Sequence, residues 1–216
     1  GAKSLPATIT DAEARTGSAT IALNVAAILA IHDIQGAADF SPYDNVAVRT
    51  HGIVTVVGTR GFYLQDPVAD GNEATSEAIF VFTSSEPTVA VGDALEIMGT
   101  VDEFRPGNDA VNLTTTEIVA PTSINVLSSG NALPPAVVIG NGGRVPPSTV
   151  IDDDSPGDVE AAGALFDPAN DGLDFYESLE AMLVQVNGAE AGGPKNTFGE
   201  LPVVADSGAS IRTNRG

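Results

Sequence analysis

The sequence predicts an all-β protein, in which a five-stranded Greek-key barrel of the OB type is followed by a second small β unit. Apolar residues make up 43% of the chain while aromatic residues make up 5%, and Val, Ala and Ile dominate, which favours strands. The 23 glycines and 14 prolines are typical of turns between strands. Between residues 45 and 119 lie five β-rich runs, and a glycine interrupts each of the two longest.

The barrel prediction depends on the spacing of these runs. The predicted strands cover residues 45–57, 62–65, 77–82, 94–104 and 110–119, with turns or loops at 58–61, 66–76, 91–93 and 105–109. Gly52 and Gly99 lie inside the two long strands, where a missing side chain makes room for the sharp bend that a small barrel requires. A five-stranded barrel of this size corresponds to the OB-fold. A fragment of a β-sandwich is the alternative.

The chain outside the barrel divides by composition. The predicted parts are an N-terminal arm (1–35), the barrel (36–120), a Pro/Gly/Asp-rich linker (121–172) and a second β unit (173–216) that we expect to be truncated. In the arm, residues 10–14 have the pattern of a helix start capped by Thr10, and residues 19–31 fit either a buried strand or a short helix. In the second unit, a helical turn over 175–182 leads into strands at 183–186 and 198–206.

The chain is strongly acidic, with 29 Asp and Glu against 9 Lys and Arg and a net charge of −20. A field of that sign repels a phosphate backbone, so non-specific binding of nucleic acid is disfavoured. The acidity favours either solubility in an extracellular medium or metal binding. The absence of cysteine excludes a disulfide framework, a zinc–thiolate site and a thiol nucleophile. No apolar run reaches the roughly 18 residues of a membrane span.

One loop is the best candidate for a metal site. Asp66, Asp70, Asn72 and Glu77 offer oxygen ligands, and Gly71 permits a tight turn between them. Hard cations such as Ca²⁺ favour oxygen-rich, flexible loops, although the spacing is not that of an EF-hand. A second acidic group consists of Asp152, Asp153, Asp154 and Asp158, for which a solvated linker is the competing interpretation.

A possible nucleic-acid surface is formed by cations close to aromatic residues in the barrel strands. Its candidates are Arg49, Arg60, Tyr63 and Arg105, and a base would stack on Tyr63. The phenylalanines of the same strands are expected mostly inside the barrel. No complete catalytic set is present: the histidines are His32, beside Asp33, and His51, and no Gly-x-Ser-x-Gly elbow occurs.

An ordered series of motifs resembles one known domain. The motifs are IHDIQG at 31–36, Ser41-Pro42, residues 46–57, GFYLQDP at 61–67, residues 79–82 and 91–104, SSGNALP at 128–134 and YESLEAMLV at 176–184. Together they resemble the OB-fold-like domain of large secreted bacterial nucleases of the ExeM and NucH type, over roughly residues 30–215. The arm before residue 30 matches nothing in that domain.

The resemblance implies a function for the parent protein. In that family the domain precedes a catalytic domain of the endonuclease/exonuclease/phosphatase superfamily, which hydrolyses phosphodiesters with Mg²⁺ or Ca²⁺ and is absent here. We therefore expect a non-catalytic segment of a secreted bacterial nuclease, with the downstream nuclease domain and DNA or RNA as partners. It would position the substrate or organise the catalytic domain. The alternative is an extracellular structural or interaction module, stabilised by Ca²⁺, that binds protein or polysaccharide.

Overall fold

The structure, a computed structural model, describes residues 2–24, 27–110, 112–153, 159–160, 164–197 and 199–209. Within these residues it confirms the all-β class, because strands predominate and the two α-helices are short. The strands are β1 (Ala2–Thr10), β2 (Thr16–Asn24), β3 (Ala47–Val57), β4 (Gly61–Gln65), β5 (Ala78–Phe82), β6 (Ala94–Phe104), β7 (Thr115–Ser128), β8 (Val137–Ile139), β9 (Val184–Val186), β10 (Glu190–Ala191) and β11 (Val203–Val204), and the helices are α1 (Ile31–Gln35) and α2 (Gly172–Glu177).

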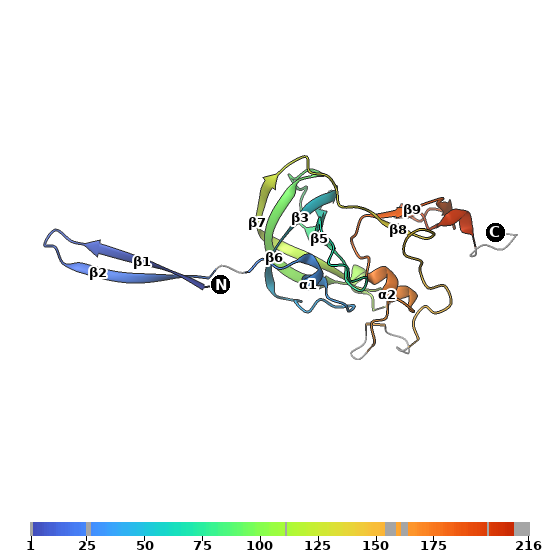
Figure 1. The fold of residues 1–216 in the computed structure, drawn as a ribbon, viewed down its shortest axis with the longest axis horizontal. Helices are drawn as coiled ribbons and strands as arrows, with labels where there is room; N and C mark the ends of the chain where they lie inside the picture. Colours follow the sequence, from blue (N-terminus) through green and yellow to red (C-terminus); the bar gives the residue numbers. More distant parts are fainter. Residues whose placement is uncertain are drawn as a thin grey trace.

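Five of the strands close into a barrel in the order β3-β4-β5-β7-β6, and β6 pairs back to β3 (Figure 1). The neighbouring strands are antiparallel except for β5 and β7, which are parallel. A closed barrel of five strands does not match the β-sandwich alternative. No helix in the described ranges combines the length and the apolar character that crossing a membrane requires.

The strand boundaries agree with the sequence prediction for β3 to β6 but not for β7. That strand was expected to begin at residue 110, and it begins at Thr115. The chain before it is held as a loop, because the Asn112 side chain donates to the Pro106 carbonyl oxygen over 2.9 Å and Arg105 donates to the Asn112 carbonyl. At its other end β7 continues to Ser128, into the segment where a linker was expected.

Two glycines allow neighbouring strands to approach the long strands β3 and β6 closely. A Cβ atom on Gly52 would lie 2.8 Å from the Gln65 carbonyl oxygen of β4. A Cβ atom on Gly99 would lie 2.4 Å from the Ile118 side chain of β7, and the β6–β7 register shifts at this point. Any larger residue at either position would force the paired strands apart.

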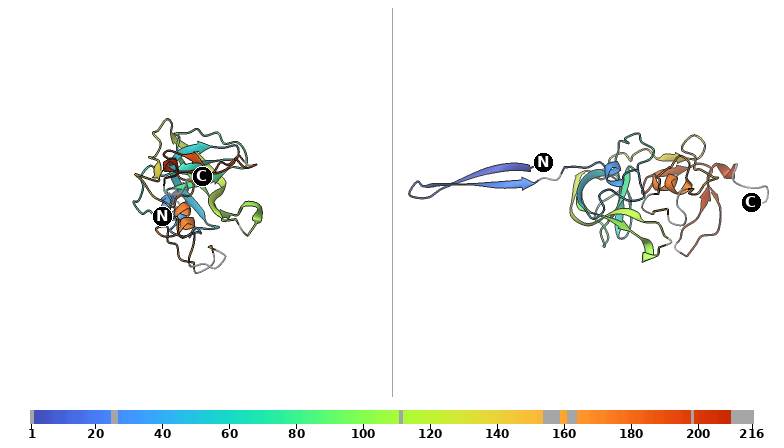
Figure 2. Two further views of the ribbon diagram at one scale, coloured as in Figure 1. Left: turned by 90° about the vertical axis from the view of Figure 1, so that its right-hand side faces the viewer. Right: turned by 90° about the horizontal axis from the view of Figure 1, so that it is seen from below.

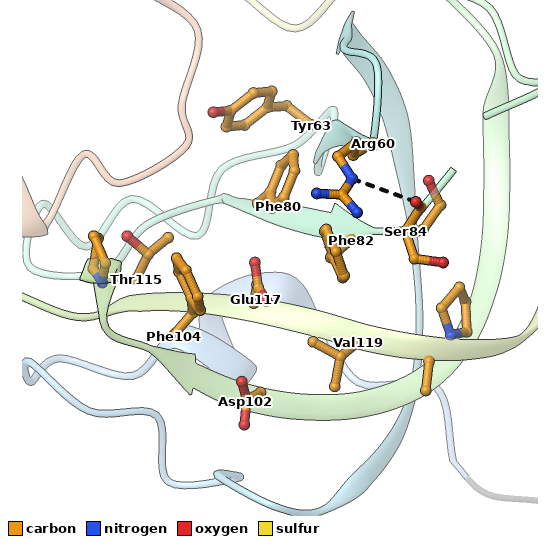
Figure 3. A pocket seen from close by; sticks show the side chains of 14 residues that line it. Arg60, Tyr63, Phe80, Phe82, Ser84, Asp102, Phe104, Thr115, Glu117 and Val119 are labelled. Atoms are coloured by element: carbon orange, nitrogen blue, oxygen red, sulfur yellow. Dashed lines mark hydrogen bonds between the residues drawn. The ribbon is translucent and has the colours of Figure 1, made fainter. Parts of the chain in front are cut away.

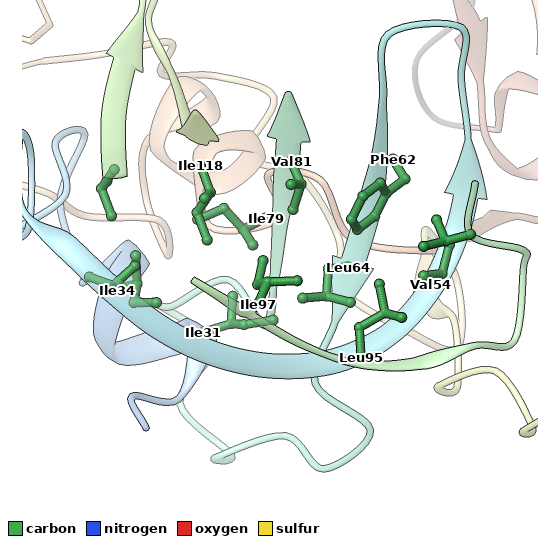
Figure 4. Close-up of a cluster of buried hydrophobic side chains, with 13 residues drawn as sticks. Ile31, Ile34, Val54, Phe62, Leu64, Ile79, Val81, Leu95, Ile97 and Ile118 are labelled. Carbon is green, nitrogen blue, oxygen red and sulfur yellow. The ribbon is translucent and has the colours of Figure 1, made fainter. Parts of the chain in front are cut away.

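The hydrophobic core fills the barrel and includes two residues from α1. Ile31 and Ile34 are fully buried and lie among the strand side chains in Figure 4. The core consists of Ile31, Ile34, Val48, Val54, Phe62, Leu64, Ile79, Val81, Val89, Leu95, Ile97, Val101 and Ile118. Along β4 and β5 every second residue belongs to this core, so the residues between them face outward.

The N-terminal arm is a β-hairpin that stands away from the barrel (Figures 1 and 2). The helix start expected at Thr10 is wrong. The Asp11 carboxylate accepts hydrogen bonds from the backbone N–H groups of Glu13 and Arg15, at 3.0 and 2.9 Å. These bonds close a turn that contains Ala14 at a φ of 59°, so β2 pairs back along β1. Of the apolar run at 19–31, the first part belongs to β2, which ends at Asn24, and Ile31 is the first residue of α1.

The C-terminal region packs against the barrel at the end opposite the hairpin (Figure 1). It contains α2 and two small sheets, in which β8 pairs with β9 in parallel and β10 pairs with β11. The helical turn and the strand at 183–186 were predicted, whereas β8 lies in the expected linker. Hydrogen bonds tie this region to the barrel. The Leu183 N–H donates to Gln65 Oε1 over 2.8 Å, and the Ser76 hydroxyl, in the loop before β5, donates to the Glu180 carbonyl over 2.6 Å.

Candidate functional site

An open groove with a volume of about 830 Å³ lies on the outer side of the barrel (Figure 3). At its centre, side chains from four adjacent strands form a row. The register places Tyr63 of β4 opposite Phe80 of β5, and Phe80 opposite Glu117 of β7. Glu117 in turn lies opposite Asp102 of β6. We call this site the aromatic groove; its principal lining residues are Arg60, Tyr63, Phe80, Phe82, Asp102, Phe104 and Glu117.

One wall of the aromatic groove is built of rings. The ring centroids of Tyr63 and Phe80 are 5.0 Å apart and the rings are tilted by 51°. The Arg60 guanidinium lies 5.8 Å from the centroid of the Phe82 ring, within reach of a cation–π interaction. Arg60 also donates a hydrogen bond of 3.4 Å to the Ser84 carbonyl oxygen. Gly61 leaves the space that the Phe80 ring occupies, because a Cβ atom there would lie 2.4 Å from Phe80 Cζ.

The opposite wall carries two carboxyl groups. The Glu117 residue is 6% exposed. Burial, followed by the charge of Asp102, raises the pKa of Glu117 to about 7. The aromatic groove therefore combines ring faces with a carboxyl group that changes its charge near neutral pH, which gives it donors and acceptors as well as an apolar floor.

The four residues of the predicted nucleic-acid patch do not all line the same site. Arg60 and Tyr63 both line the aromatic groove. Arg49 instead forms an ion pair of 2.6 Å with Glu96 of β6, and Arg105 pairs with Glu160. Two of the four candidates therefore have carboxylate partners, and Arg60 and Tyr63 are the two that lie in the aromatic groove.

The phenylalanines were also misplaced by the sequence prediction. Phe62 is fully buried, as expected, but Phe80, Phe82 and Phe104 line the aromatic groove, and Phe104 is 47% exposed. The alternation of side chains along β4 and β5 could have distinguished them. Phe62 pairs with the core residue Val81, whereas Phe80 pairs with Tyr63 on the outer face of the barrel. Glu117 and Asp102 join the groove through strand pairing, which the sequence alone does not display.

In the predicted metal loop, the side-chain oxygens of Asp66, Asp70 and Asn72 accept hydrogen bonds from other residues of the same loop. Asp66 accepts from the Val68 N–H over 3.1 Å, and Asn72 accepts from the Ala74 N–H over 3.2 Å. Asp70 accepts from the Asn72 N–H at 2.6 Å through one oxygen and from the Thr75 hydroxyl at 3.1 Å through the other. Only Asp70 and Glu77 of the four candidates belong to a compact group of potential ligands among the described residues.

The third member of that group is His32, whose partner the sequence did not identify. His32, Asp70 and Glu77 offer ligand atoms that all lie within 4.8 Å of one another. His32 Nδ1 lies 3.1 Å from Glu77 Oε2, whereas its other ring nitrogen is 3.9 Å from Asp33. Glu77 also accepts a hydrogen bond of 2.6 Å from the Asp70 N–H. Burial works against protonation of His32, but Glu77 outweighs it and raises the pKa of His32.

A second set of carboxylates, which the sequence analysis did not predict, lies on α2 and on the residues just before and after it. Asp171, Asp174, Glu177 and Glu180 recur at every third position, and each is buried or half-buried. Glu180 accepts from the Thr116 N–H over 3.3 Å, and Glu103 accepts from the Thr116 hydroxyl over 2.9 Å. Burial, with Glu180 as the largest neighbouring charge, raises the pKa of Glu177 to about 9, and burial also raises the pKa of Glu180 to about 8.

The predicted linker cluster is only partly described. Asp154 and Asp158 lie outside the described residues. Asp152 and Asp153 are described, and their charges act on Asp171 at the start of α2. The signal that sequence reasoning missed is the spacing of three residues between Asp171, Asp174 and Glu177, which places neighbouring carboxylates at the start and along one side of a short helix.

Comparison with known proteins adds one finding. Residues 138–216 match a family described as "Domain of unknown function (DUF8508)". This part contains β8, β9 and α2 and excludes the barrel. No curated protein matches the chain.

Proposed function

We propose that the chain is a secreted, non-catalytic binding module whose barrel is of the OB type and binds a neutral polysaccharide in the aromatic groove. The strand order supports the OB assignment, because the third strand of the barrel is parallel to the fifth and the first pairs with both the second and the fourth. OB-folds bind oligonucleotides and oligosaccharides on the face of strands 2 and 3 and in the adjoining loops. Here those strands are β4 and β5, which carry Tyr63, Phe80 and Phe82.

The observation that carries the proposal is the row in which Tyr63 and Phe80 adjoin Glu117 and Asp102. A sugar ring packs its apolar face on an aromatic ring, and its hydroxyl groups donate to carboxylate oxygens, which can only accept when ionised. A phosphate backbone brings acceptors and negative charge to the same carboxylates, in a chain of net charge −20. An uncharged ligand rich in hydroxyl groups fits this groove better.

A second candidate function is the positioning of single-stranded nucleic acid for a secreted metal-dependent nuclease. It is favoured by Arg60 and Tyr63, which share the aromatic groove with rings on which bases can stack. The nuclease domain as a partner, and the Mg²⁺ or Ca²⁺ that it would use, are supported by the resemblance of the motifs. The secreted location is supported by the acidity and by the same resemblance.

Affinity electrophoresis through gels that contain β-glucan, xylan or galactomannan tests the first function. We expect one of these polymers to retard the chain, and Phe80→Ala to weaken binding by roughly 10-fold or more, because truncation of a central aromatic contact residue typically costs about 2 kcal/mol or more. Val68→Ala, at an exposed position outside the groove, is the matched control.

Fluorescence anisotropy with labelled oligo(dT) at low salt tests the second function. If the oligonucleotide binds, if Arg60→Ala abolishes that binding, and if none of the polysaccharides is bound, the nucleic-acid function replaces the first. Failure of both ligands, with the fold intact by circular dichroism, would contradict both assignments of the groove.

A further inference from the structure

Three side chains that can bind a metal ion meet beside the barrel from separate parts of the chain. His32 lies on α1, Asp70 lies in the loop between β4 and β5, and Glu77 directly precedes β5. Each offers one ligand atom, and these atoms all lie within 4.8 Å of one another. Among the described residues, no other group of three or more histidine and acidic side chains comes together in this way.

The barrel holds His32 and Glu77 at the separation that a shared ion requires. Ile31, next to His32, is fully buried in the core. The Gln35 side chain donates to the Ala78 carbonyl over 2.6 Å, which fastens α1 beside Glu77. As a result, His32 Nδ1 lies 3.1 Å from Glu77 Oε2. Two ligands of one tetrahedral Zn²⁺ ion, each about 2.1 Å from the metal, are roughly 3.4 Å apart, so this pair needs little movement to bind one ion together.

The third ligand, Asp70, comes from a loop that folds back onto Glu77. The Asp70 N–H donates to Glu77 Oε1 over 2.6 Å, and Gly71 follows at a φ of 83°, which a glycine adopts without strain. Asp70 is exposed, whereas the Glu77 side chain is only 4% exposed. The Asp70 carboxylate can therefore move toward the other two ligands without repacking the core. Its exposed side also leaves room for a water molecule as a further ligand.

The hydrogen bonds that these carboxylates already accept leave positions for an ion. An ionised carboxylate has about four lone-pair positions. Glu77 uses one for the Asp70 N–H and one for His32, and Asp70 accepts from the Asn72 N–H and the Thr75 hydroxyl. In the metal-free protein, a proton lies between His32 Nδ1 and Glu77 Oε2. A bound ion takes the place of that proton, which is released to the solvent.

The surroundings of His32 favour a cation as well. The Asp33 carboxylate lies 3.9 Å from His32 Nε2, the ring nitrogen that does not contact Glu77. A histidine that binds a metal ion usually directs its second ring N–H toward a carboxylate, a carbonyl group or water. Three carboxylates thus surround one imidazole, and in the described part of the chain no lysine or arginine forms an ion pair with Asp33, Asp70 or Glu77. A divalent cation reduces this excess of negative charge.

We propose that His32, Asp70 and Glu77 bind one divalent cation of the Zn²⁺ class, with His32 Nδ1 as the nitrogen ligand and water completing the coordination. Zn²⁺ accepts imidazole nitrogen and carboxylate oxygen at similar distances. Ca²⁺ requires six to eight oxygen ligands, and this site offers two carboxylates and a nitrogen. The ion joins α1 to the loop between β4 and β5. The site shares no residue with the aromatic groove, so the proposal does not depend on what the groove binds.

Calorimetric titration of the full, untagged chain with ZnCl₂ after treatment with a chelator tests the proposal. We expect saturable binding of one ion per chain. His32→Gln should weaken binding by roughly 100-fold or more, because loss of a ligand costs more than the loss of an outer-shell partner. The chain has two histidines, so His51→Gln, at an exposed position, is the matched control and should bind like the wild type. Asp70→Asn should weaken binding by roughly 10-fold or more, whereas Asp66→Asn, in the same loop but outside the cluster, should not.

Thermal unfolding provides a second readout, which also reports whether the variants fold. Zn²⁺ should raise the unfolding temperature of the wild type and of His51→Gln by several degrees and leave that of His32→Gln unchanged. Absence of saturable Zn²⁺ binding by the wild type, or equal Zn²⁺ affinity in His32→Gln, overturns the proposal, since the latter result describes adventitious binding to exposed carboxylates. Tighter binding of CaCl₂ than of ZnCl₂, lost in Asp66→Asn, also overturns it, because that result moves the ion to the oxygen ligands of the loop.

Discussion

The barrel and the C-terminal region of this chain are stabilised by different interactions. The barrel buries thirteen apolar residues in one continuous core. In the described part of the chain after residue 128, the buried apolar residues are Phe175 and Leu179, while the buried polar ones include Asp171 and Asp174. The barrel therefore depends on removal of apolar surface from water, and the C-terminal region depends on how its buried polar groups are satisfied.

Truncation of the core should produce the largest effect. Phe62 is fully buried at the centre of the barrel, so Phe62→Ala should lower the free energy of unfolding by about 3–5 kcal/mol. Leu179→Ala in the C-terminal region should cost about 2 kcal/mol or less, because fewer apolar neighbours surround it. Urea unfolding at constant pH measures both. Phe104→Ala, at an exposed ring, is the control and should change the free energy by less than about 0.5 kcal/mol. An equal loss for Phe62→Ala and Leu179→Ala would remove the distinction between the regions.

The same contrast explains how much of the fold the sequence could predict. In the barrel the apolar residues alternate along strands that end at turn residues, so β3 to β6 could be placed nearly to the residue. The start of β7 could not, because hydrogen bonds from Arg105 and Asn112 hold the preceding residues in a loop although their composition favours a strand. The hairpin of the arm was missed because Asp11 closes a turn where the local pattern suggests a helix cap.

The pH dependence of stability should reveal the carboxyl pair of Glu177, at the end of α2, and Glu180, which share a hydrogen bond. The pKa of Glu177 rises from 4.5 to about 9 on folding, so the folded chain keeps a proton that the unfolded chain releases between these values. The contribution of Glu177 to stability is therefore greatest below pH 4.5 and declines as the pH rises toward 9. We expect a loss on the order of 2 kcal/mol between pH 5 and pH 8 in chelator.

The variant Glu177→Gln separates this effect from other titrations. It should remove most of the decline and raise the unfolding temperature at pH 8, because an amide can donate to Glu180 at any pH. Urea unfolding across this pH range measures the slope. A wild-type chain whose stability is flat from pH 5 to pH 8 would contradict the buried, proton-sharing pair.

The candidate sites were less predictable than the strands, for a physical reason. Each combines residues that are distant in sequence: His32 meets Glu77, 45 residues away, and Glu117 meets Phe80 through strand pairing. The pattern of alternation in β4 and β5 could have placed Phe80 on the outer face. Nothing local could have shown that Glu96 neutralises Arg49 or that Glu160 neutralises Arg105, because these pairs exist only once the strands and the C-terminal region have packed.

The smallest effect is expected at the ion pair of His32 and Glu77, where the buried carboxylate already has its counter-charge. Glu77 raises the pKa of His32 above 6.5, so the pair stabilises the fold below that pH and its contribution is lost as the pH rises through the folded pKa. Burial also raises the pKa of Glu77. The 3.1 Å contact between His32 Nδ1 and Glu77 Oε2 favours the ion pair, in which His32 is protonated and Glu77 is ionised. His32→Gln should therefore lower the free energy of unfolding by about 1 kcal/mol at pH 6 and by less at pH 8.

The variants His32→Gln and Glu177→Gln should change the free energy of unfolding in opposite directions. Replacing His32 removes a compensated charge and destabilises the protein, whereas Glu177→Gln puts a neutral amide in place of a carboxyl group that is forced to keep its proton, and stabilises the protein at pH 8. His51→Gln, at an exposed position on β3, is the matched control and should have no effect at either pH. Urea unfolding of the three variants at pH 6 and pH 8 measures these differences. If His32→Gln is neutral at pH 6, the contact between His32 and Glu77 does not stabilise the fold, and the hydrogen bond from the Asp70 N–H is the one that holds Glu77.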